Sequence, residues 1–196
     1  AVDRIVGGLE KKNKITTEEE RRSIAIHEAG HATISWMLRY ANPLVKVTIV
    51  PRGKALGAAW YLPEERQITT TEALQDQLCA LLGGRAAEDL FLGRVSTGAA
   101  NDLERVTKLA YAMVTYYGMS DKLPNINYYE MQNDGWNLTK PYSDTTAEVI
   151  DAEVNRIISE QYERAKSILR EHEAGHHELA DLLLKREVIL ADDVER

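Results

Sequence analysis

The segment IAIHEAGHATI, residues 24–34, places two histidines and a glutamate within one short apolar stretch. Side chains four residues apart lie on one face of a helix, so His27 and His31 can both reach one ion at about 2.0–2.1 Å. Glu28, next to the first histidine, can contact a metal-bound water without being a ligand itself. Zinc lowers the pKa of such a water to about 7, and a carboxylate then accepts its proton during attack on a carbonyl. The spacing therefore predicts a zinc site with Glu28 as the general base.

The residues on either side predict that this segment lies in one long helix. Thr17 and Glu20 have the spacing of a capping box, which marks the start of a helix. Pro43 disfavours a helical conformation in the residue before it, so the helix is expected to end by about Tyr40. Apolar residues cover much of its girth: Ile24, Ala25, Ile26, Ala32, Ile34 and Trp36. We therefore expect a buried helix, which restricts the access of water to the metal.

The remaining pattern is mainly helical, with one small β-hairpin. Apolar and polar residues alternate over 45–50, a turn follows at 51–53, and 58–62 is a plausible partner strand. Further helices are expected over about 69–91 (capped by Thr69), 101–117, from 145 onward (capped by Thr145) and over 173–186. The pair Gly83-Gly84 falls inside the first of these helices, which suggests that another helix crosses closely there.

The composition excludes several classes of protein. With 24 Lys and Arg against 31 Asp and Glu, the formal charge is −7, which argues against nucleic-acid binding because that affinity comes from clustered basic residues. The single cysteine, Cys79, cannot form an intrachain disulfide or a cysteine-based zinc cluster, and its apolar neighbours predict a buried thiol. The sequence also lacks the run of about 20 apolar residues that a membrane-spanning helix needs.

A second copy of the motif, HEAGH at residues 172–176, is followed by His177. Charged residues surround this copy, and it lies close to the end of the sequence. We therefore expect a solvated helix end or turn, in which Gly175 frays or stops the helix. Metal binding by His172 and His176 would then be adventitious.

A catalytic zinc usually has three protein ligands, so the third must lie elsewhere in the sequence. Ile34 and Met37 stand where the metzincin class needs Gly and His, which excludes that class. The candidates are Glu88, Asp89 and Asp102. Asp102 falls in the first turn of a predicted helix, where the helix dipole favours an ionised carboxylate. Glu88 could instead hydrogen-bond a ligand or form a buried ion pair with Arg85, and spacing alone does not choose between these roles.

Five blocks of sequence together resemble a known family. IAIHEAGHA, KVTIVPRG, LLGGRAAEDLFLG, STGAANDLERVT and YGMSDKL, in that order, are similar to the peptidase domain of FtsH-type ATP-dependent zinc metalloproteases. This family includes bacterial FtsH and the mitochondrial and chloroplast AAA proteases. The resemblance implies a mainly helical zinc-peptidase domain over residues 15–196, with residues 1–14 as the tail and linker of an AAA ATPase module. It also implies zinc ligands at His27, His31 and Asp102, with Glu28 as the catalytic base.

The resemblance also implies partners and a location. It suggests a homohexamer, with the ATPase module in the same polypeptide, that degrades unfolded, misassembled and membrane proteins. The location would be the bacterial cytoplasmic membrane with this domain in the cytoplasm, or the matrix side of the mitochondrial inner membrane. No G-x-x-x-x-G-K-[ST] loop occurs, so these residues carry no ATP site of that type. The loop 128–140 departs from many family members.

Three further hypotheses stand beside this one. An extended substrate is expected to pair as a strand with residues 45–50 or the neighbouring segment. One alternative function is a non-catalytic, metal-stabilised oligomerisation module, and another is a stand-alone cytosolic zinc peptidase. Retention of the complete HExxH motif favours an active peptidase over a non-catalytic module.

Overall fold

The computed structural model describes residues 16–53, 55–128 and 140–194. The predicted ATPase tail, residues 1–14, and most of the loop 128–140 therefore lie outside the described residues. The helices are α2 (Glu18–Met37), α3 (Thr71–Leu92), the 3-10 turn η1 (Thr97–Ala99), α4 (Ala100–Thr115), α6 (Asp144–Glu171), α7 (Glu173–Arg186) and α8 (Ala191–Val194). The strands are β1 (Leu44–Thr48), β2 (Ala58–Tyr61), β3 (Met119–Ser120), β4 (Leu123–Pro124) and β5 (Val188–Leu190).

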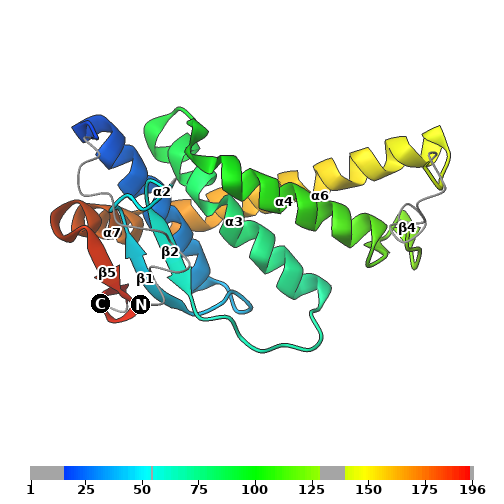
Figure 1. The fold of residues 1–196 in the computed structure, drawn as a ribbon, viewed down its shortest axis with the longest axis horizontal. Coiled ribbons are helices and arrows are strands. Elements are labelled where there is room, and N and C mark those ends of the chain that lie inside the picture. The colour runs from blue at the N-terminus through cyan, green and yellow to red at the C-terminus, as the bar shows by residue number, and fades with distance from the viewer. Residues whose placement is uncertain (1–15, 54, 129–139, 195–196) are drawn as a thin grey trace.

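A small sheet packs at one end of a mainly helical molecule (Figure 1). Its strands run antiparallel in the order β2-β1-β5, so β1 is the central strand. The predicted hairpin of β1 and β2 is confirmed. The third strand, β5, was not predicted because three residues are too few to show alternation. Away from the sheet, α4 and α6 extend side by side to the tip where β3 and β4 lie (Figure 1).

Helix α2 lies at the centre of the larger of two apolar clusters. All residues from Ala25 to Ser35 are buried, as its apolar girth predicts. The capping box is also confirmed, because Thr17 Oγ1 accepts from the Glu20 backbone and Glu20 Oε2 accepts from the Thr17 backbone. The Cys79 thiol is buried in the same cluster. A second cluster joins α3, α4 and α6.

The starts of two other helices differ from the prediction. Thr70, and not Thr69, caps α3, with Oγ1 accepting from the Ala73 backbone at 3.2 Å. Ser143, and not Thr145, caps α6. Several hydroxyl residues stand together at both starts, so more than one of them meets the sequence rule. None of the described helices has the length and apolar character needed to cross a membrane.

The predicted close helix crossing is confirmed where α2 meets α3. A Cβ atom added to Gly30 would lie 2.5 Å from the Gly83 carbonyl oxygen. One added to Gly83 would lie 3.0 Å from the Gly30 carbonyl oxygen. The two backbones therefore touch directly, and glycine at both positions allows α2 to approach α3.

The second HEAGH segment differs from the prediction of a solvated helix end. His172 ends α6, and α7 begins at the next residue and continues past Gly175 for three turns. His176 has no exposed surface because α7 folds back onto α2. The prediction was wrong because it weighed only the charged neighbours along the chain, whereas His176 faces a helix about 150 residues earlier.

Candidate metal centre

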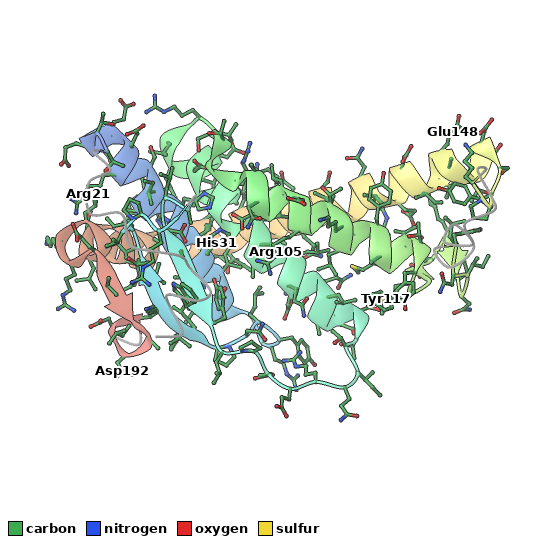
Figure 2. The ribbon with its side chains drawn as sticks, viewed as in Figure 1. Arg21, His31, Arg105, Tyr117, Glu148 and Asp192 are labelled. Atoms are coloured by element: carbon green, nitrogen blue, oxygen red, sulfur yellow. The ribbon has the colours of Figure 1, made fainter. Side chains whose placement is uncertain are left out.

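Three side chains converge where α2 meets α4. His27 Nε2 and His31 Nε2 lie 3.1 Å apart. The Oδ2 atom of Asp102 lies 3.2 Å from the first and 3.0 Å from the second. The two histidines are adjacent on one face of α2, and Asp102 lies in the first turn of α4. His31 is labelled near the middle of the molecule in Figure 2.

The other nitrogen of each imidazole donates a hydrogen bond away from this point. His31 Nδ1 donates to the Ala80 carbonyl at 2.8 Å, and His27 Nδ1 donates to Glu88 Oε2 at 3.3 Å. Because a carbonyl and a carboxylate only accept, both Nδ1 atoms carry hydrogen, so in the neutral imidazoles both Nε2 atoms present lone pairs. Together with Asp102 Oδ2, three lone pairs point at one another. This arrangement is repulsive unless a cation lies between them.

The donor set and its dimensions fit zinc. Ligand atoms about 2.0–2.1 Å from a tetrahedral ion lie about 3.3 Å from one another. The observed separations of 3.0–3.2 Å are close to that value. Two nitrogens and one oxygen leave a fourth position for water or substrate, as in catalytic zinc sites. In the part of the chain that the structure describes, this is the one set of three such side chains close enough to share an ion.

The pKa values of these groups indicate that the site favours positive charge. Burial disfavours a charged imidazole, but hydrogen bonds to Asp102 and Glu88 outweigh it and raise the pKa of His27 to about 10. Burial also opposes ionisation of Asp102, yet the two imidazoles hold its pKa well below the usual range. A divalent cation meets the same demand for positive charge that a proton meets on His27.

The two acidic alternatives to Asp102 have different surroundings. Glu88 is almost fully buried, and its second oxygen accepts a hydrogen bond from Ser96 Oγ. It contacts the nitrogen of His27 that points away from the convergence point, so it orients this imidazole. Asp89 points towards α6 and accepts a hydrogen bond from Tyr162 at 2.7 Å. Neither carboxylate shares the point where the three lone pairs meet.

Glu28 lies beside the first histidine and is 8% exposed. Burial raises the pKa of its carboxyl, and the imidazoles of His31 and His27 partly offset that effect. A Cβ atom added to Gly57 would lie 3.0 Å from Glu28 Cγ, so the chain entering β2 passes directly against this glutamate. A carboxyl with a raised pKa next to the convergent ligands is suited to accept and return a proton.

Residues 14–196 match the model of Peptidase family M41. The chain belongs to this family. The resemblance to FtsH-type peptidase domains and the mainly helical fold are thereby confirmed.

Three curated relatives show how far this similarity extends. The "ATP-dependent zinc metalloprotease FtsH" of Parabacteroides distasonis is 73% identical over 100% of this chain and 28% of its own length. The mitochondrial "ATP-dependent zinc metalloprotease FTSH 8" of Oryza sativa is 49% identical over 100% of this chain and 24% of its own. The "Mitochondrial inner membrane m-AAA protease component AFG3L2" of Mus musculus is 45% identical over 99% of this chain and 24% of its own. The chain thus spans about a quarter of the curated relatives it matches.

Gly84 is a site residue of this peptidase-family domain that sequence reasoning did not identify. A Cβ atom added there would lie 2.3 Å from His27 Nε2, so the backbone of α3 forms one wall of the metal site. The sequence did indicate a close approach at Gly83-Gly84, but that pair was assigned only to helix packing. The first glycine serves the crossing with α2, and the second makes room for the imidazole.

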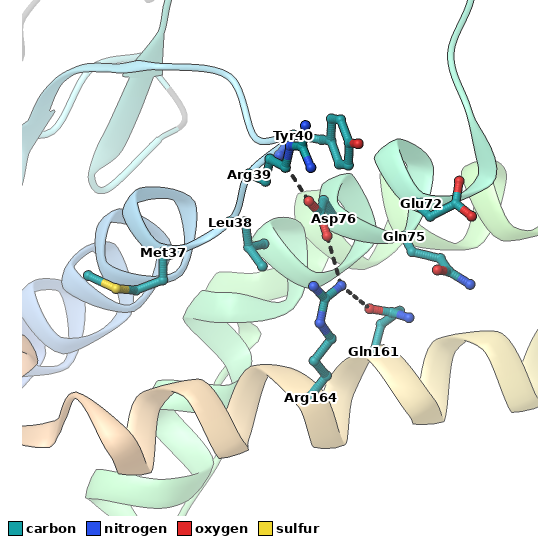
Figure 3. Close-up of a pocket in the computed structure, with 9 residues that line it drawn as sticks. All are labelled: Met37, Leu38, Arg39, Tyr40, Glu72, Gln75, Asp76, Gln161 and Arg164. Carbon is teal, nitrogen blue, oxygen red and sulfur yellow. Dashed lines mark hydrogen bonds and ion pairs between the residues drawn. The ribbon is translucent and has the colours of Figure 1, made fainter.

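A cavity lies elsewhere in the domain, at the C-terminal end of α2 (Figure 3). Its volume is about 440 Å³. Two charged groups on its wall pair with each other, since Asp76 accepts from the Arg164 side chain at 2.8 Å, and Asp76 also accepts from the Tyr40 backbone at 3.0 Å. None of the convergent ligands lines this cavity. The candidate metal centre is therefore defined by its lone pairs and not by the size of a pocket.

Proposed function

We propose that this domain is a zinc-dependent endopeptidase, with His27, His31 and Asp102 as zinc ligands and Glu28 as the general base. The observation that carries the proposal is the convergence of three lone pairs within 3.2 Å, next to a buried glutamate. Zinc, when bound, polarises the scissile carbonyl and lowers the pKa of a water, so that this water can lose a proton and attack the carbonyl carbon. Family membership supports the same chemistry.

The residues of the chain divide the remaining work. The Ala80 carbonyl and the Glu88 carboxylate fix the tautomer and direction of the two imidazoles, so the lone pairs are in place before substrate arrives. Glu28 takes the proton from the attacking water and returns it to the leaving amine. Burial raises the pKa of Glu28, which makes this carboxylate a stronger proton acceptor between the two steps.

The open edge of β2 is the place we propose for the substrate. The sequence allowed pairing with residues 45–50 or with their neighbours, and β1 is excluded because strands flank it on both sides. Among the described residues, β2 pairs only with β1, so its other edge can bind an extended peptide. The approach of Gly57 to Glu28 sets the start of this edge against the general base. Strand pairing is made by the backbone, which suits unfolded proteins of varied sequence.

The rest of the proposal concerns the whole protein. Because the relatives are named as ATP-dependent and as a mitochondrial inner membrane AAA protease, we propose that this domain works with an AAA ATPase module in the same polypeptide. Residues 1–14 would be the tail and linker of that module. The assembly would be a homohexamer that degrades unfolded and membrane proteins. It would lie in the bacterial cytoplasmic membrane with this domain in the cytoplasm, or in the mitochondrial inner membrane facing the matrix.

The proposal is tested by Glu28→Gln, with zinc content and cleavage of unfolded casein as readouts. The variant should keep one zinc per chain and lose cleavage by about 100-fold or more, because the amide cannot accept the proton. Glu173→Gln, at the equivalent place in the second HEAGH, is the matched control and should cleave like the unchanged protein. Cleavage that survives in Glu28→Gln removes this residue from the mechanism. Bound zinc without cleavage in the unchanged domain would favour a metal-stabilised oligomerisation module.

A further inference from the structure

The buried histidine of the second HEAGH segment has a partner on the metal helix. His176 Nε2 donates to the Ile26 carbonyl at 3.0 Å, from the side of α2 where α7 packs (Figure 1). Ile26 directly precedes His27, so this carbonyl belongs to the peptide group that carries the His27 nitrogen. Within α2 the same oxygen also accepts from Gly30, and a carbonyl oxygen has two lone pairs for the two donors. The hydrogen bond therefore holds the backbone at the first proposed ligand.

The ring of His176 is fixed on its other sides as well. Because Nε2 carries the hydrogen, Nδ1 is an acceptor, and His177 Nδ1 donates to it at 3.3 Å. The ring of Phe91 stacks on His176 with centroids 4.5 Å apart. Burial lowers the pKa of His176 to about 4, so the imidazole is neutral at neutral pH and keeps this arrangement.

Phe91 connects the same imidazole to the other support of His27. Phe91 lies on α3 one turn after Glu88, whose carboxylate accepts from His27 Nδ1. His176 thus contacts both helices that orient His27: α2 through the Ile26 carbonyl and α3 through the Phe91 ring. A displacement of this imidazole would change the distance between the backbone of His27 and the carboxylate that directs its ring.

We propose that His176 is a positioning residue for the metal centre, which holds His27 in register with Glu88 through the Ile26 carbonyl and the Phe91 ring. The inference rests on the proposed zinc site. A buried imidazole is costly to desolvate, and an apolar side chain of similar volume would pack there at no such cost. Packing alone therefore predicts that His176→Leu is harmless or stabilising. If His176 positions the metal centre, His176→Leu should instead bind zinc more weakly while the protein remains folded.

The experiment compares His176→Leu, His176→Gln and Glu178→Ala with the unchanged chain. Glutamine retains an N–H donor at a similar reach, leucine removes it, and Glu178→Ala, at an exposed position of α7, tests general disturbance of that helix. Zinc affinity is measured by competition with a chelator, and the ligand geometry by the visible absorption of the cobalt-substituted protein. We expect His176→Leu to weaken zinc binding by about 10-fold, the lower end of the range for groups that orient ligands. His176→Gln and Glu178→Ala should stay within about twofold of the unchanged chain, well below that range.

A readout without metal separates this inference from the proposed function. In the metal-free chain, the ¹⁵N resonances of the His27 ring should shift in His176→Leu and not in Glu178→Ala. An unchanged protein that binds no zinc would contradict the proposed function, while these resonances still test His176. Equal zinc affinity and unshifted resonances in a folded His176→Leu overturn the inference. So does a folded His176→Gln that binds zinc as weakly as the leucine variant, or a second bound zinc that disappears with His176.

Discussion

The same five residues, HEAGH, occur twice in this chain in two different environments. In the first copy, residues 27–31, both imidazoles direct lone pairs to a point shared with Asp102. In the second, residues 172–176, His172 ends one helix and only His176 is buried, with its Nε2 hydrogen directed at a backbone carbonyl. The comparison teaches that, in this chain, the five residues form a candidate ligand set only in the copy that a third group and two orienting acceptors meet.

The largest effect is expected when the first copy loses Asp102, because no such carboxylate meets the histidines of the second copy in the described residues. Asp102→Ala should weaken zinc binding by about 100-fold or more and abolish cleavage, because two histidines alone hold a divalent ion poorly. Asp89→Ala is the control, since that carboxylate is bonded to Tyr162 and points away from the site. Zinc affinity of both variants, measured by chelator competition, gives the answer. Loss of zinc in Asp89→Ala but not in Asp102→Ala would refute the ligand assignment.

The fourth residue of the motif sharpens the comparison through stability. Gly30→Ala should destabilise the domain by about 3 kcal/mol, because the new methyl group meets the backbone of α3 and the helices must separate. Gly175→Ala should stabilise it by about 0.5–1 kcal/mol, since α7 is helical there and no atom lies within 4 Å of the added Cβ. Denaturant unfolding of both variants measures the difference. Similar effects of the two substitutions would contradict the described crossing.

Much of the site was predictable from the sequence because its signals are local. The two histidines, Glu28 and the helix that carries them follow from spacing and capping, and the Asp102 candidate followed from its place in a first turn. The glycine pair indicated a close crossing, yet the contact of Gly84 with His27 depends on how far α2 is rotated. The burial of His176 depends on α7 folding back across 150 residues of chain. Local patterns carry no information on such distant packing.

Acidification should destabilise the domain through the buried histidine of the second copy. The pKa of His176 falls from about 6.5 to about 4 on folding, through burial and the nearby His177, so the unfolded chain binds the extra proton more readily. The free energy of unfolding should therefore fall by about 3 kcal/mol as the pH drops from about 6.5 to about 4. The difference between the unchanged chain and His176→Leu isolates this contribution, because other titrating groups cancel. Parallel pH profiles of the two proteins would contradict the burial of His176.

The smallest effect concerns how the two helices that carry the motif begin. Thr17→Ala removes a side-chain cap and one half of the capping box of α2, and should cost about 1 kcal/mol of stability. His172→Ala should cost much less, because the His172 side chain makes no capping hydrogen bond at the start of α7. Thermal unfolding of the two variants gives the comparison. The metal helix is thus held by its own cap at one end and by α3 along its length, whereas α7 begins without a side-chain cap and depends on its packing against α2. A cost at His172 equal to that at Thr17 would show that the start of α7 is locally stabilised after all.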